Sequence, residues 1–399
     1  MRNNNTYFDN ASTSFPKPEI LTQIMADFTT IFGGTYGRSA YSKVQTSTAL
    51  YEAARTRIAY VMNVEEEEKV FFTMNATMGA NTLIQTYPFT KDTKVWVSPL
   101  EHNAIMRPLY EMSNRIGFKI QVLPHEQGGK IHLEALTKMD KSEFDLIIVN
   151  HVSNVSGLIQ PVAELGKWCD KDIELWLDCT QSLGSIQCNL DDWGVDAAIF
   201  TGHKALMGPT GTGGFFVRNP DKHTHFMYGG TGTNSHSYSM PNTYPEKFEV
   251  GTPNMVGVIA LGEIIGHRPK NKYSRKAYKE LINRLNSNPK ITMYSDPSPD
   301  SQSTVFSFTH SEYTPSEFAE AIYENYYIEL RSGMHCSPLA HKTLGTYPQG
   351  TIRISLSPYH TSKDLVYLAE CIEALDKEHL QKADEVLNYT TQLSDGYES

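Results

Sequence analysis

The sequence has no apolar stretch of the length that a transmembrane helix requires. Its most apolar stretch, Met255 to Ile265, is far shorter than the ~20 residues that cross a bilayer as a helix. The first ten residues, MRNNNTYFDN, are polar and lack the apolar centre of a secretory signal peptide. We therefore expect a cytoplasmic protein that does not have a membrane as a partner.

Cysteine is also scarce, and its number is odd. The five cysteines are scattered along the 399 residues, at Cys169, Cys179, Cys188, Cys336 and Cys371. Small secreted domains that depend on disulfides carry a dense and even set instead. The pattern argues against a disulfide scaffold and fits a protein kept in a reducing compartment.

An excess of positive charge is missing as well. The chain carries 35 basic against 45 acidic residues, a formal net charge of −10, and no basic cluster. Nucleic acids and anionic membranes attract basic patches, so neither is expected as the main partner. The composition is 40% hydrophobic and 20% charged, without repeats, and 399 residues are enough for two domains with a large core.

Two glycine-rich segments superficially suggest nucleotide-binding loops, GPTGTGG at 208–214 and GGTGTNS at 229–235. Neither contains the GK[ST] ending by which a P-loop holds phosphates, and neither places GxGxxG between a strand and a helix. We therefore reject a nucleotide site.

Apolar runs typical of buried strands alternate with helical patterns up to about residue 220. This alternation indicates βαβ units and a mainly parallel sheet flanked by helices. Residues 16–62 are expected to be helical, with a break at Gly33, Gly34 and Gly37. The strands are expected at residues 70–73, 94–97, 119–123, 145–149, 175–177, 197–200 and 215–217, and helices near 105–115 and 162–169.

The C-terminal part predicts a smaller α+β unit, entered through a long helical stretch from about Pro253. Strands are expected at 304–309, 327–331 and 351–356, with a helix at 315–326. A last helix begins with Thr361 and Asp364, which resemble a capping box. Its expected core residues are Leu365, Leu368, Ala369, Ile372 and Leu375. The polar tail after Lys382 is expected to fray.

Two polar residues follow buried strands and suggest chemistry. Burial disfavours the charge of a lysine, so Lys204 after the strand at 197–200 could act as a nucleophilic amine; it could equally lie in an exposed loop. Asp178 ends the strand at 175–177, where open α/β sheets bind ligands. A carboxylate near such a lysine is the arrangement that protonates the pyridine ring of pyridoxal phosphate (PLP). A helix N-cap is the other interpretation of Asp178, and both can hold.

Several segments between residues 7 and 357 together resemble one known family. They are YFDNAST, MNATMGAN, SPLEHNA, NHVSNVSGLIQP, LDCTQSLG, TGHKALMGPTGTGG, FEVGTPN, RSGMHCSPLAH and GTIRISLS. In this order they resemble the class V aminotransferase family of fold-type I PLP enzymes, in its cysteine desulfurase and selenocysteine lyase branch. The resemblance implies a PLP-binding α/β domain at 16–255 with a seven-stranded sheet, and a small α+β domain built from 1–15 and 256–399.

The resemblance also implies the cofactor site. Lys204 would bind PLP covalently, Asp178 would face the ring nitrogen, and His102 would stack on the ring as a general acid or base; an isolated histidine is otherwise more often structural. The remaining implied contacts are Ala76, Thr77 and Thr201 for the phosphate, Asn154 and Gln181 for the phenolic oxygen, and Gly251 and Thr252 for the phosphate in the neighbouring subunit of a homodimer. His203 is implied as a further residue that binds the cofactor. Without the resemblance, Asn75 or Thr77 would be a plain N-cap.

The segment RSGMHCSPLAH carries the predicted nucleophile. Cys336 lies in a polar loop, whereas Cys169 and Cys371 fall on expected helices; an idle loop cysteine is the generic alternative. By resemblance, Arg353 clamps the substrate carboxylate as an arginine fork can, with Arg331 beside it. Asn10 and Ala11 are placed near the substrate, although turn chemistry explains Asn10 equally well. His335 and His341 flank Cys336 without an evident fourth ligand, so no metal is expected.

The sequence therefore predicts a PLP-dependent cysteine desulfurase that converts L-cysteine to L-alanine and leaves a persulfide on Cys336 for a sulfur-acceptor protein. A selenocysteine lyase or another class V lyase or aminotransferase is the alternative that keeps the cofactor, because a fold does not fix its reaction. An inactive interaction protein is the third reading. It is disfavoured because Lys204, Asp178, His102 and His203 are all present.

Overall fold

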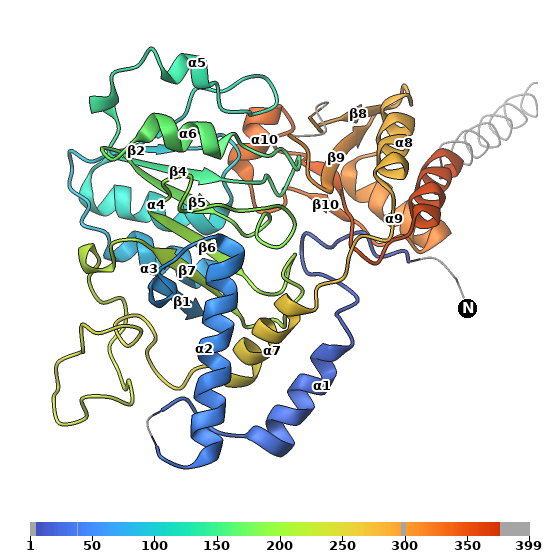
Figure 1. Ribbon diagram of the computed structural model, residues 1–399. Coiled ribbons are helices and arrows are strands. Elements are labelled where there is room, and N and C mark those ends of the chain that lie inside the picture. The colour runs from blue at the N-terminus through green and yellow to red at the C-terminus, as the bar shows by residue number, and fades with distance from the viewer. Residues whose placement is uncertain (1–4, 38, 297–300, 376–399) are drawn as a thin grey trace, which may run out of the picture.

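Two β-sheets with separate cores lie next to each other in the computed structural model, which describes residues 5–37, 39–296 and 301–375 (Figure 1). The larger sheet has seven strands in the order β1-β7-β6-β5-β4-β2-β3, and the smaller has four in the order β10-β11-β9-β8. No helix in the described ranges has the length and apolarity that a bilayer span needs.

The large sheet is parallel except at β7, which runs antiparallel to both neighbours, β1 and β6. Its strands are short and mostly buried on both faces, as parallel sheets between helices are. The strands are β1 (Val70–Thr73), β2 (Lys94–Val97), β3 (Lys119–Val122), β4 (Leu146–Asn150), β5 (Glu174–Asp178), β6 (Ala197–Thr201) and β7 (Gly213–Val217).

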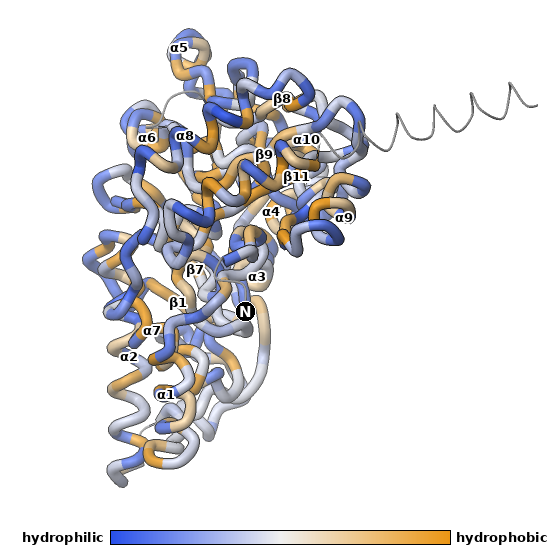
Figure 2. The backbone as a smooth tube through the Cα atoms, turned by 90° about the vertical axis from the view of Figure 1, so that its right-hand side faces the viewer, coloured by the Kyte–Doolittle hydropathy of each residue, from blue (hydrophilic) through white to orange (hydrophobic). Residues whose placement is uncertain are grey.

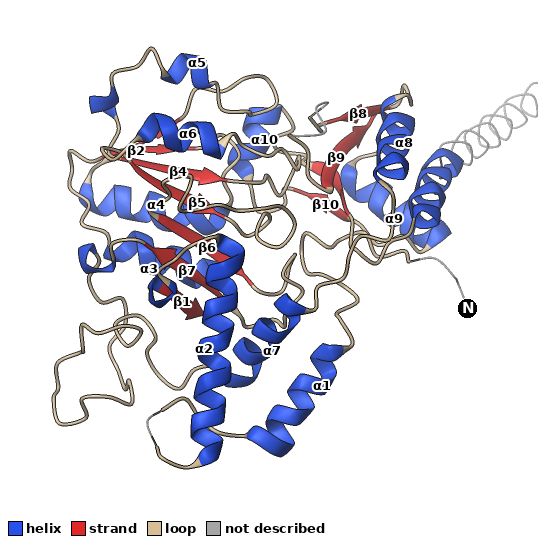
Figure 3. Cartoon of the chain, viewed as in Figure 1, coloured by secondary structure: helices blue, strands red, loops and turns tan. Residues whose placement is uncertain are grey.

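Helices cover both faces of this sheet (Figure 3). Alternate strand residues point to opposite faces, so Val149 and Leu177 join one core with α2 and α6, while Ile148 and Trp176 join another with α3 and α4. The helices of this part are α1 (Ile20–Asp27), a π-helical turn (Phe28–Phe32), α2 (Ser42–Met62), α3 (Ala76–Thr86), α4 (Asn103–Ile116), α5 (Leu133–Leu136), α6 (Val162–Cys169) and α7 (Met255–Gly266).

The small sheet is antiparallel throughout and has its own core around Phe306 and Phe308. Its strands β9 and β11 are among the more hydrophobic segments in Figure 2. Phe8 joins the N-terminal segment to this unit through hydrogen bonds with Glu329 and Ser355. The elements are α8 (Arg275–Asn286), β8 (Ile291–Met293), β9 (Val305–His310), α9 (Pro315–Tyr326), β10 (Arg331–Gly333), α10 (Pro338–Leu344), β11 (Thr351–Ser355) and helical residues 362–375.

The predicted fold class is confirmed, including the seven strands of the mainly parallel sheet. One predicted strand is wrong: Tyr327 has φ 55° and caps α9, and β10 begins only at Arg331. Residues 327–330 are irregular apart from an isolated bridge between Glu329 and Tyr7. Strand β8 was not predicted. The domain boundary at residue 255 stays a prediction; α7, which begins there, packs Val258 and Leu261 into the core that contains α2.

The predicted start of the last helix is confirmed. The Asp364 carboxylate accepts a hydrogen bond from the Thr361 amide at 2.6 Å, and the Thr361 hydroxyl accepts one from the Asp364 amide at 3.3 Å. All of the residues predicted for its core are buried: Leu365, Leu368, Ala369, Ile372 and Leu375. The tail after Lys382 lies outside the described residues.

Candidate active site

Polar residues follow three adjacent strands of the large sheet at one edge. Strands β4, β5 and β6 are parallel, and their register pairs Asn150 with Asp178 and Asp178 with Ile199. Lys204 follows β6 after a short turn. Ligands of open α/β sheets bind outside the carboxyl ends of the strands, so the register brings the predicted lysine and aspartate to the expected place.

Lys204 is the centre of a group of charged side chains. Burial lowers its pKa to about 8, and the nearby Asp178 carboxylate opposes that shift. The guanidinium groups of Arg353 and Arg331 lower the pKa further, and Cys336 is close enough to raise it. The structure therefore brings together residues that are more than 150 positions apart in the sequence, and it supplies a lysine whose neutral amine is accessible near physiological pH.

Asp178 has one carboxylate oxygen engaged and one free. Oδ1 accepts a hydrogen bond from the Thr180 amide at 2.9 Å, which is the local turn interaction expected of a cap-like aspartate. Oδ2 is buried and has no hydrogen-bond partner among the described residues. A buried acceptor without a partner is costly, and the protonated ring nitrogen of PLP is a donor of the required kind. Asp178 thus fits the cofactor.

His102 caps α4 and is neutral. Its Nδ1 accepts a hydrogen bond from the Ala104 amide at 3.0 Å, so in the neutral ring the proton sits on Nε2. Burial lowers the pKa of His102 to about 4, and the positive charge of Lys204 adds to that shift. His102 therefore has a structural role, as the N-cap of α4, as the sequence analysis allowed. This role fixes the orientation of the ring and leaves the Nε2–H group free to act as a donor.

Glu101 is a buried residue that sequence reasoning missed. Its Oε1 accepts a hydrogen bond from the Ser98 hydroxyl at 2.7 Å, and Oε2 has no partner among the described residues. Burial raises the pKa of this carboxyl well above its usual range, and the Asp178 charge raises it further. Burial and the Asp178 charge thus both favour the neutral form of this second carboxyl group. An acidic residue just before the predicted His102 was the only available signal.

The start of α3 suits an anion. The N-cap Asn75 accepts a hydrogen bond from the Met78 amide at 3.0 Å, which confirms the plain N-cap as one role of this segment. Ala76 and Thr77 are the first helical residues, whose amides have no partner inside a helix. Gly213 on β7 lets the chains approach, because a Cβ there would lie 2.7 Å from the Asn75 Cα.

Two further residues predicted to contact the cofactor, Thr201 and His203, lie just before Lys204 in the sequence. The Thr201 hydroxyl makes only a long hydrogen bond, 3.4 Å to the Thr212 carbonyl. Nδ1 of His203 is buried without a partner among the described residues, and burial lowers the pKa of this histidine to about 4. The His203 carbonyl accepts hydrogen bonds from the Ser14 amide and the Lys17 ammonium. A weakly bonded hydroxyl and a ring nitrogen that has no partner in the described part of the chain thus lie on the residues around Lys204.

Asn154 holds the cysteine loop in this structure. Its amide nitrogen donates to the His335 carbonyl at 2.8 Å, and its oxygen accepts from the Ser337 hydroxyl at 2.8 Å. Gln181 donates to the Ala11 carbonyl at 3.0 Å. Contact of Asn154 and Gln181 with the cofactor's phenolic oxygen stays a prediction.

Cys336 is exposed on a loop docked beside His102. Its carbonyl accepts a hydrogen bond from the Asn103 amide at 2.9 Å, next to the N-cap of α4. The loop follows β10 and turns through two left-handed residues, His335 with φ 46° and Cys336 with φ 57°. The His335 ring is held by a hydrogen-bonding contact between its Nε2 and the Thr351 carbonyl oxygen. The turn therefore buries the histidine and turns the thiol outward.

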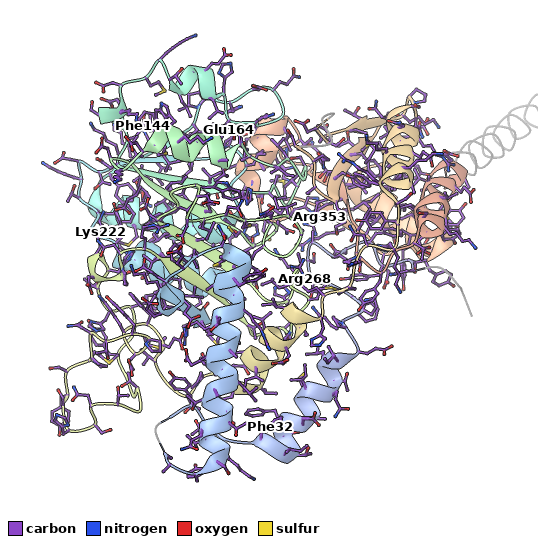
Figure 4. The ribbon with its side chains drawn as sticks, in the orientation of Figure 1. Phe32, Phe144, Glu164, Lys222, Arg268 and Arg353 are labelled. Carbon is purple, nitrogen blue, oxygen red and sulfur yellow. The ribbon has the colours of Figure 1, made fainter. Side chains whose placement is uncertain are left out.

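Arg353 on β11 is buried between the two sheets (Figure 4). Its guanidinium donates to Asp9 at 2.7 Å, to the Ser12 hydroxyl at 2.9 Å and to the Asn154 carbonyl at 3.1 Å. Nε is buried and has no partner among the described residues. The Arg331 guanidinium also donates to Ser12 and lies 4.0 Å from the Cys336 Sγ. Both arginines thus lie close to the thiol.

A cavity of about 330 Å³ reaches Lys204 between the sheets. Its lining includes the predicted residues Asn10, Ala11, Gln181 and Lys204. Asn10 and Ala11 are held there by hydrogen bonds to Ser355.

Gly251 and Thr252 line a different cavity of about 270 Å³, together with Tyr36 and Glu249. The structure does not bring these two predicted residues into the group around Lys204. Their predicted contact with a neighbouring subunit stays a prediction.

The sequence matches the family model Aminotransferase class-V over residues 6–368. A probable cysteine desulfurase of Methanothermobacter thermautotrophicus is 30% identical over 382 residues, which cover 92% of this chain and 94% of that protein. One of Pyrococcus abyssi is 30% identical over 387 residues, covering 93% and 94%. The solved cysteine desulfurase of Thermococcus onnurineus NA1 superposes with a TM-score of 0.86 at 27% identity, covering 93% of this chain and 94% of that one.

Proposed function

The chain belongs to the class V aminotransferase family, and from this premise we propose that it is a PLP-dependent cysteine desulfurase that converts L-cysteine to L-alanine. The observation that carries the proposal is the exposed Cys336 thiol on a loop docked beside His102, near Lys204, Arg331 and Arg353. Aminotransferase chemistry has no use for such a thiol, whereas sulfur transfer requires one.

The donors and acceptors of the site fit PLP. Asp178 Oδ2 is a buried acceptor for a protonated ring nitrogen. The first amides of α3 and the Thr201 hydroxyl suit its phosphate, and Lys204 supplies the amine. When bound, PLP supplies an electron sink conjugated to the substrate's α-carbon.

The chain's own residues then hold the substrate and move its protons. Nε of Arg353 is a buried donor available to a carboxylate, with the Arg331 guanidinium beside it. Lys204 Nζ and His102 Nε2 are the two groups placed to carry protons. The pKa of His102, about 4, keeps its ring neutral at working pH.

Cys336 performs the sulfur transfer. Its thiolate attacks the substrate sulfur, because a thiolate is the nucleophilic form of cysteine. A sulfur–sulfur bond forms, the carbon–sulfur bond breaks with its electron pair staying on carbon, and that carbon takes a proton to give alanine. The transferred sulfur remains on Cys336 as a persulfide, available to an acceptor protein. We also propose a homodimer, in which Gly251 and Thr252 reach the site of the neighbouring subunit.

The test is the Cys336→Ala variant, with Cys371→Ala as a control that removes a buried cysteine of the small unit. We expect Cys336→Ala to stop alanine formation from cysteine while PLP content and the cofactor's spectral response to cysteine remain. Breakdown of selenocysteine should fall less, since selenium leaves more readily.

In the wild type, intact-mass and peptide analysis after reaction without reductant should find one extra sulfur on Cys336. A Cys336→Ala variant that forms alanine from cysteine at the wild-type rate would refute the desulfurase, and the chain would then be a different class V lyase or an aminotransferase.

A further inference from the structure

Three side chains that bind soft metals meet inside the large unit, away from Cys336. They are His151, Cys179 and Cys188, and their ligand atoms all lie within 4.8 Å of one another. Within the described residues, this is the one group of three or more histidine, cysteine or carboxylate ligands so arranged. None of the three belongs to the reaction proposed above.

The sheet register explains why the group forms. Asn150 on β4 pairs with Asp178 on β5, so His151 and Cys179 are the next residues along two adjacent parallel strands. The His151 amide donates to the Asp178 carbonyl at 3.1 Å and fixes this continuation. Because strand residues alternate in direction, Cys179 turns away from the side of Asp178 and joins the core that contains α2 and α6.

Cys188 comes back to this pair after a short loop. Its Sγ lies 3.9 Å from Nδ1 of His151 and 3.8 Å from the Ser182 hydroxyl. The His151 ring is held edge-to-face against Trp193 at 5.3 Å. His151, Cys179 and Cys188 are exposed by 3%, 0% and 2%, so all three side chains are buried.

The surroundings of the group suit a cation. Among the described residues, the hydrogen-bond partners of the Cys188 Sγ are His151 Nδ1, the Ser182 hydroxyl and the Ile186 carbonyl, and none of them is a lysine or an arginine. A buried thiolate in an apolar core is costly unless it is paired or coordinates a metal.

We propose that His151, Cys179 and Cys188 form a zinc site that fixes the loop between β5 and residue 188. Tetrahedral zinc with bonds of about 2.3 Å to sulfur and about 2.0 Å to nitrogen separates such atoms by about 3.6 Å, so the observed 3.9 Å needs only a small contraction. Two cysteines and one histidine with an open position are a known zinc ligand set.

Charge and access support zinc over a monovalent soft ion. Zn²⁺ with two thiolates and a neutral imidazole has no net charge, which suits a buried site. Cu⁺ would leave one negative charge, one residue away from Asp178. Cys188 also lines a cavity of about 450 Å³ with Asn63, Gly184 and Arg268. That cavity reaches the group at Cys188, so the route of an incoming metal ion would pass this residue.

The site would act on the cofactor pocket through the chain. Asp178 is bonded directly to Cys179, and Gln181 lies within the same loop. Zinc that ties Cys179 to Cys188 and to β4 would hold the free Asp178 oxygen in place. The zinc site can be tested without any assay of the proposed reaction, because metal content does not depend on turnover.

The experiment measures zinc in the purified holoenzyme by plasma mass spectrometry after dialysis against a weak chelator, using a protein without a metal-binding tag. We expect about one zinc per chain in the wild type, and at least a tenfold loss in Cys188→Ser and Cys179→Ser. Cys169→Ser removes a buried cysteine of the same core, and Cys336→Ser removes the exposed thiol; both should keep the zinc.

A second measurement needs no variant. Replacing the metal by Co²⁺ should give visible bands of tetrahedral thiolate coordination at wavelengths longer than the cofactor absorbs. A wild type that holds no zinc after incubation with Zn²⁺ and shows no such bands would overturn the site. Copper as the retained metal, or a mass two hydrogens lower with a Cys179–Cys188 disulfide, would overturn it equally.

Discussion

At the scale of single residues, the site depends on burial more than on charge pairing. Asp178 lies near Lys204 and favours its ammonium form, yet the pKa of the lysine falls to about 8 because desolvation outweighs that attraction. His102 and His203 are shifted in the same direction by the same cause, and the pKa of each is lowered to about 4. The two histidines are therefore neutral at pH 7, whereas Lys204, with its pKa of about 8, is still mostly protonated there.

The Lys204 pKa predicts how the apoenzyme takes up PLP. Only the neutral amine attacks an aldehyde, so the uptake rate should rise about tenfold per pH unit below pH 8 and level off above it. An ordinary lysine would keep rising toward its pKa of about 10.4. Recovery of cofactor absorbance measures the rate, and a small free amine corrects for the ionisation of PLP itself.

Borohydride reduction followed by peptide mapping should place the cofactor on Lys204. Label on another lysine, or a rate that rises without a bend up to about pH 10, the range of an unperturbed lysine, would contradict this assignment.

Asp178→Asn tests the free carboxylate oxygen. The amide can still accept from Thr180, so the fold should be kept, but it cannot hold a protonated ring nitrogen. We expect turnover to fall on the order of 10²-fold, as for loss of other preorganised electrostatic contacts, with most of the PLP retained. Turnover and cofactor absorbance are the two measurements. Near-normal turnover would mean that the only role of Asp178 is its hydrogen bond with the Thr180 amide in the turn after β5.

Sequence reasoning found the residues that stand at strand ends and missed those defined by tertiary burial. Lys204 and Asp178 follow apolar runs that mark strands, so their place in the crevice could be predicted. The raised pKa of Glu101 could not be predicted, because it depends on burial and on the nearby Asp178 charge, which only the tertiary structure defines. Cys179 and Cys188 looked like scattered cysteines, since only the alternation of β5 and the return of the loop bring them together.

At the scale of elements, α7 packs on α2 on the face of the large sheet that is turned away from Asp178. The two helices approach so closely at Gly262 that a Cβ there would lie 2.4 Å from the Ala54 Cβ and 2.7 Å from its Cα. Gly266 is in the same helix, but a Cβ at this position meets nothing within 4 Å. The close contact between α7 and α2 thus requires a glycine at position 262 but not at position 266.

These two glycines form a matched pair of variants. Gly262→Ala should destabilise the protein by roughly 1–3 kcal/mol, because overpacking pushes α7 away from α2. Gly266→Ala should be neutral or stabilising by up to about 1 kcal/mol, since alanine restricts the unfolded chain and helices favour it. Denaturant unfolding of both variants measures the difference. Equal effects would show that the helices do not depend on this close approach.

The elements themselves were predictable where a single pattern dominates. The strands of the large sheet are short apolar runs, and α9 is bounded by Thr314 and Tyr327, so its limits were predicted as observed. The region from Tyr327 to Leu330 was mistaken for a strand because it alternates apolar Ile328 and Leu330 with Glu329 and is followed by β10. Its left-handed φ of 55° and the bridge from Tyr7 to Glu329 are tertiary features, which the local pattern does not encode.

At the scale of the whole molecule, Arg353 joins parts that are distant in the sequence. It lies on the small sheet, pairs with Asp9 of the N-terminal segment and donates to Asn154 after β4 of the large sheet. The Cys336 loop is tied to the same region through Asn154. The docking of the two units on each other thus sets the positions of Arg353 and Cys336 relative to Lys204.

The proposed homodimer supplies the last prediction, which concerns Thr252. This residue is exposed in the protomer and lines a cavity that does not include Lys204. Thr252→Glu should therefore leave the protomer fold intact. If Thr252 faces a phosphate in the neighbouring subunit, the added negative charge repels it, so PLP content and activity should both fall.

Hybrid dimers distinguish this arrangement from a site built within one chain. Lys204→Ala and Thr252→Glu should each be inactive alone. In a hybrid of the two, one site combines an intact Lys204 from one subunit with an intact Thr252 from the other. Co-expression should thus restore about a quarter of the wild-type activity if the subunits mix randomly, measured as alanine formed per chain. Absence of any recovery, in a preparation where mass analysis shows hybrid dimers, would mean that each chain completes its own site.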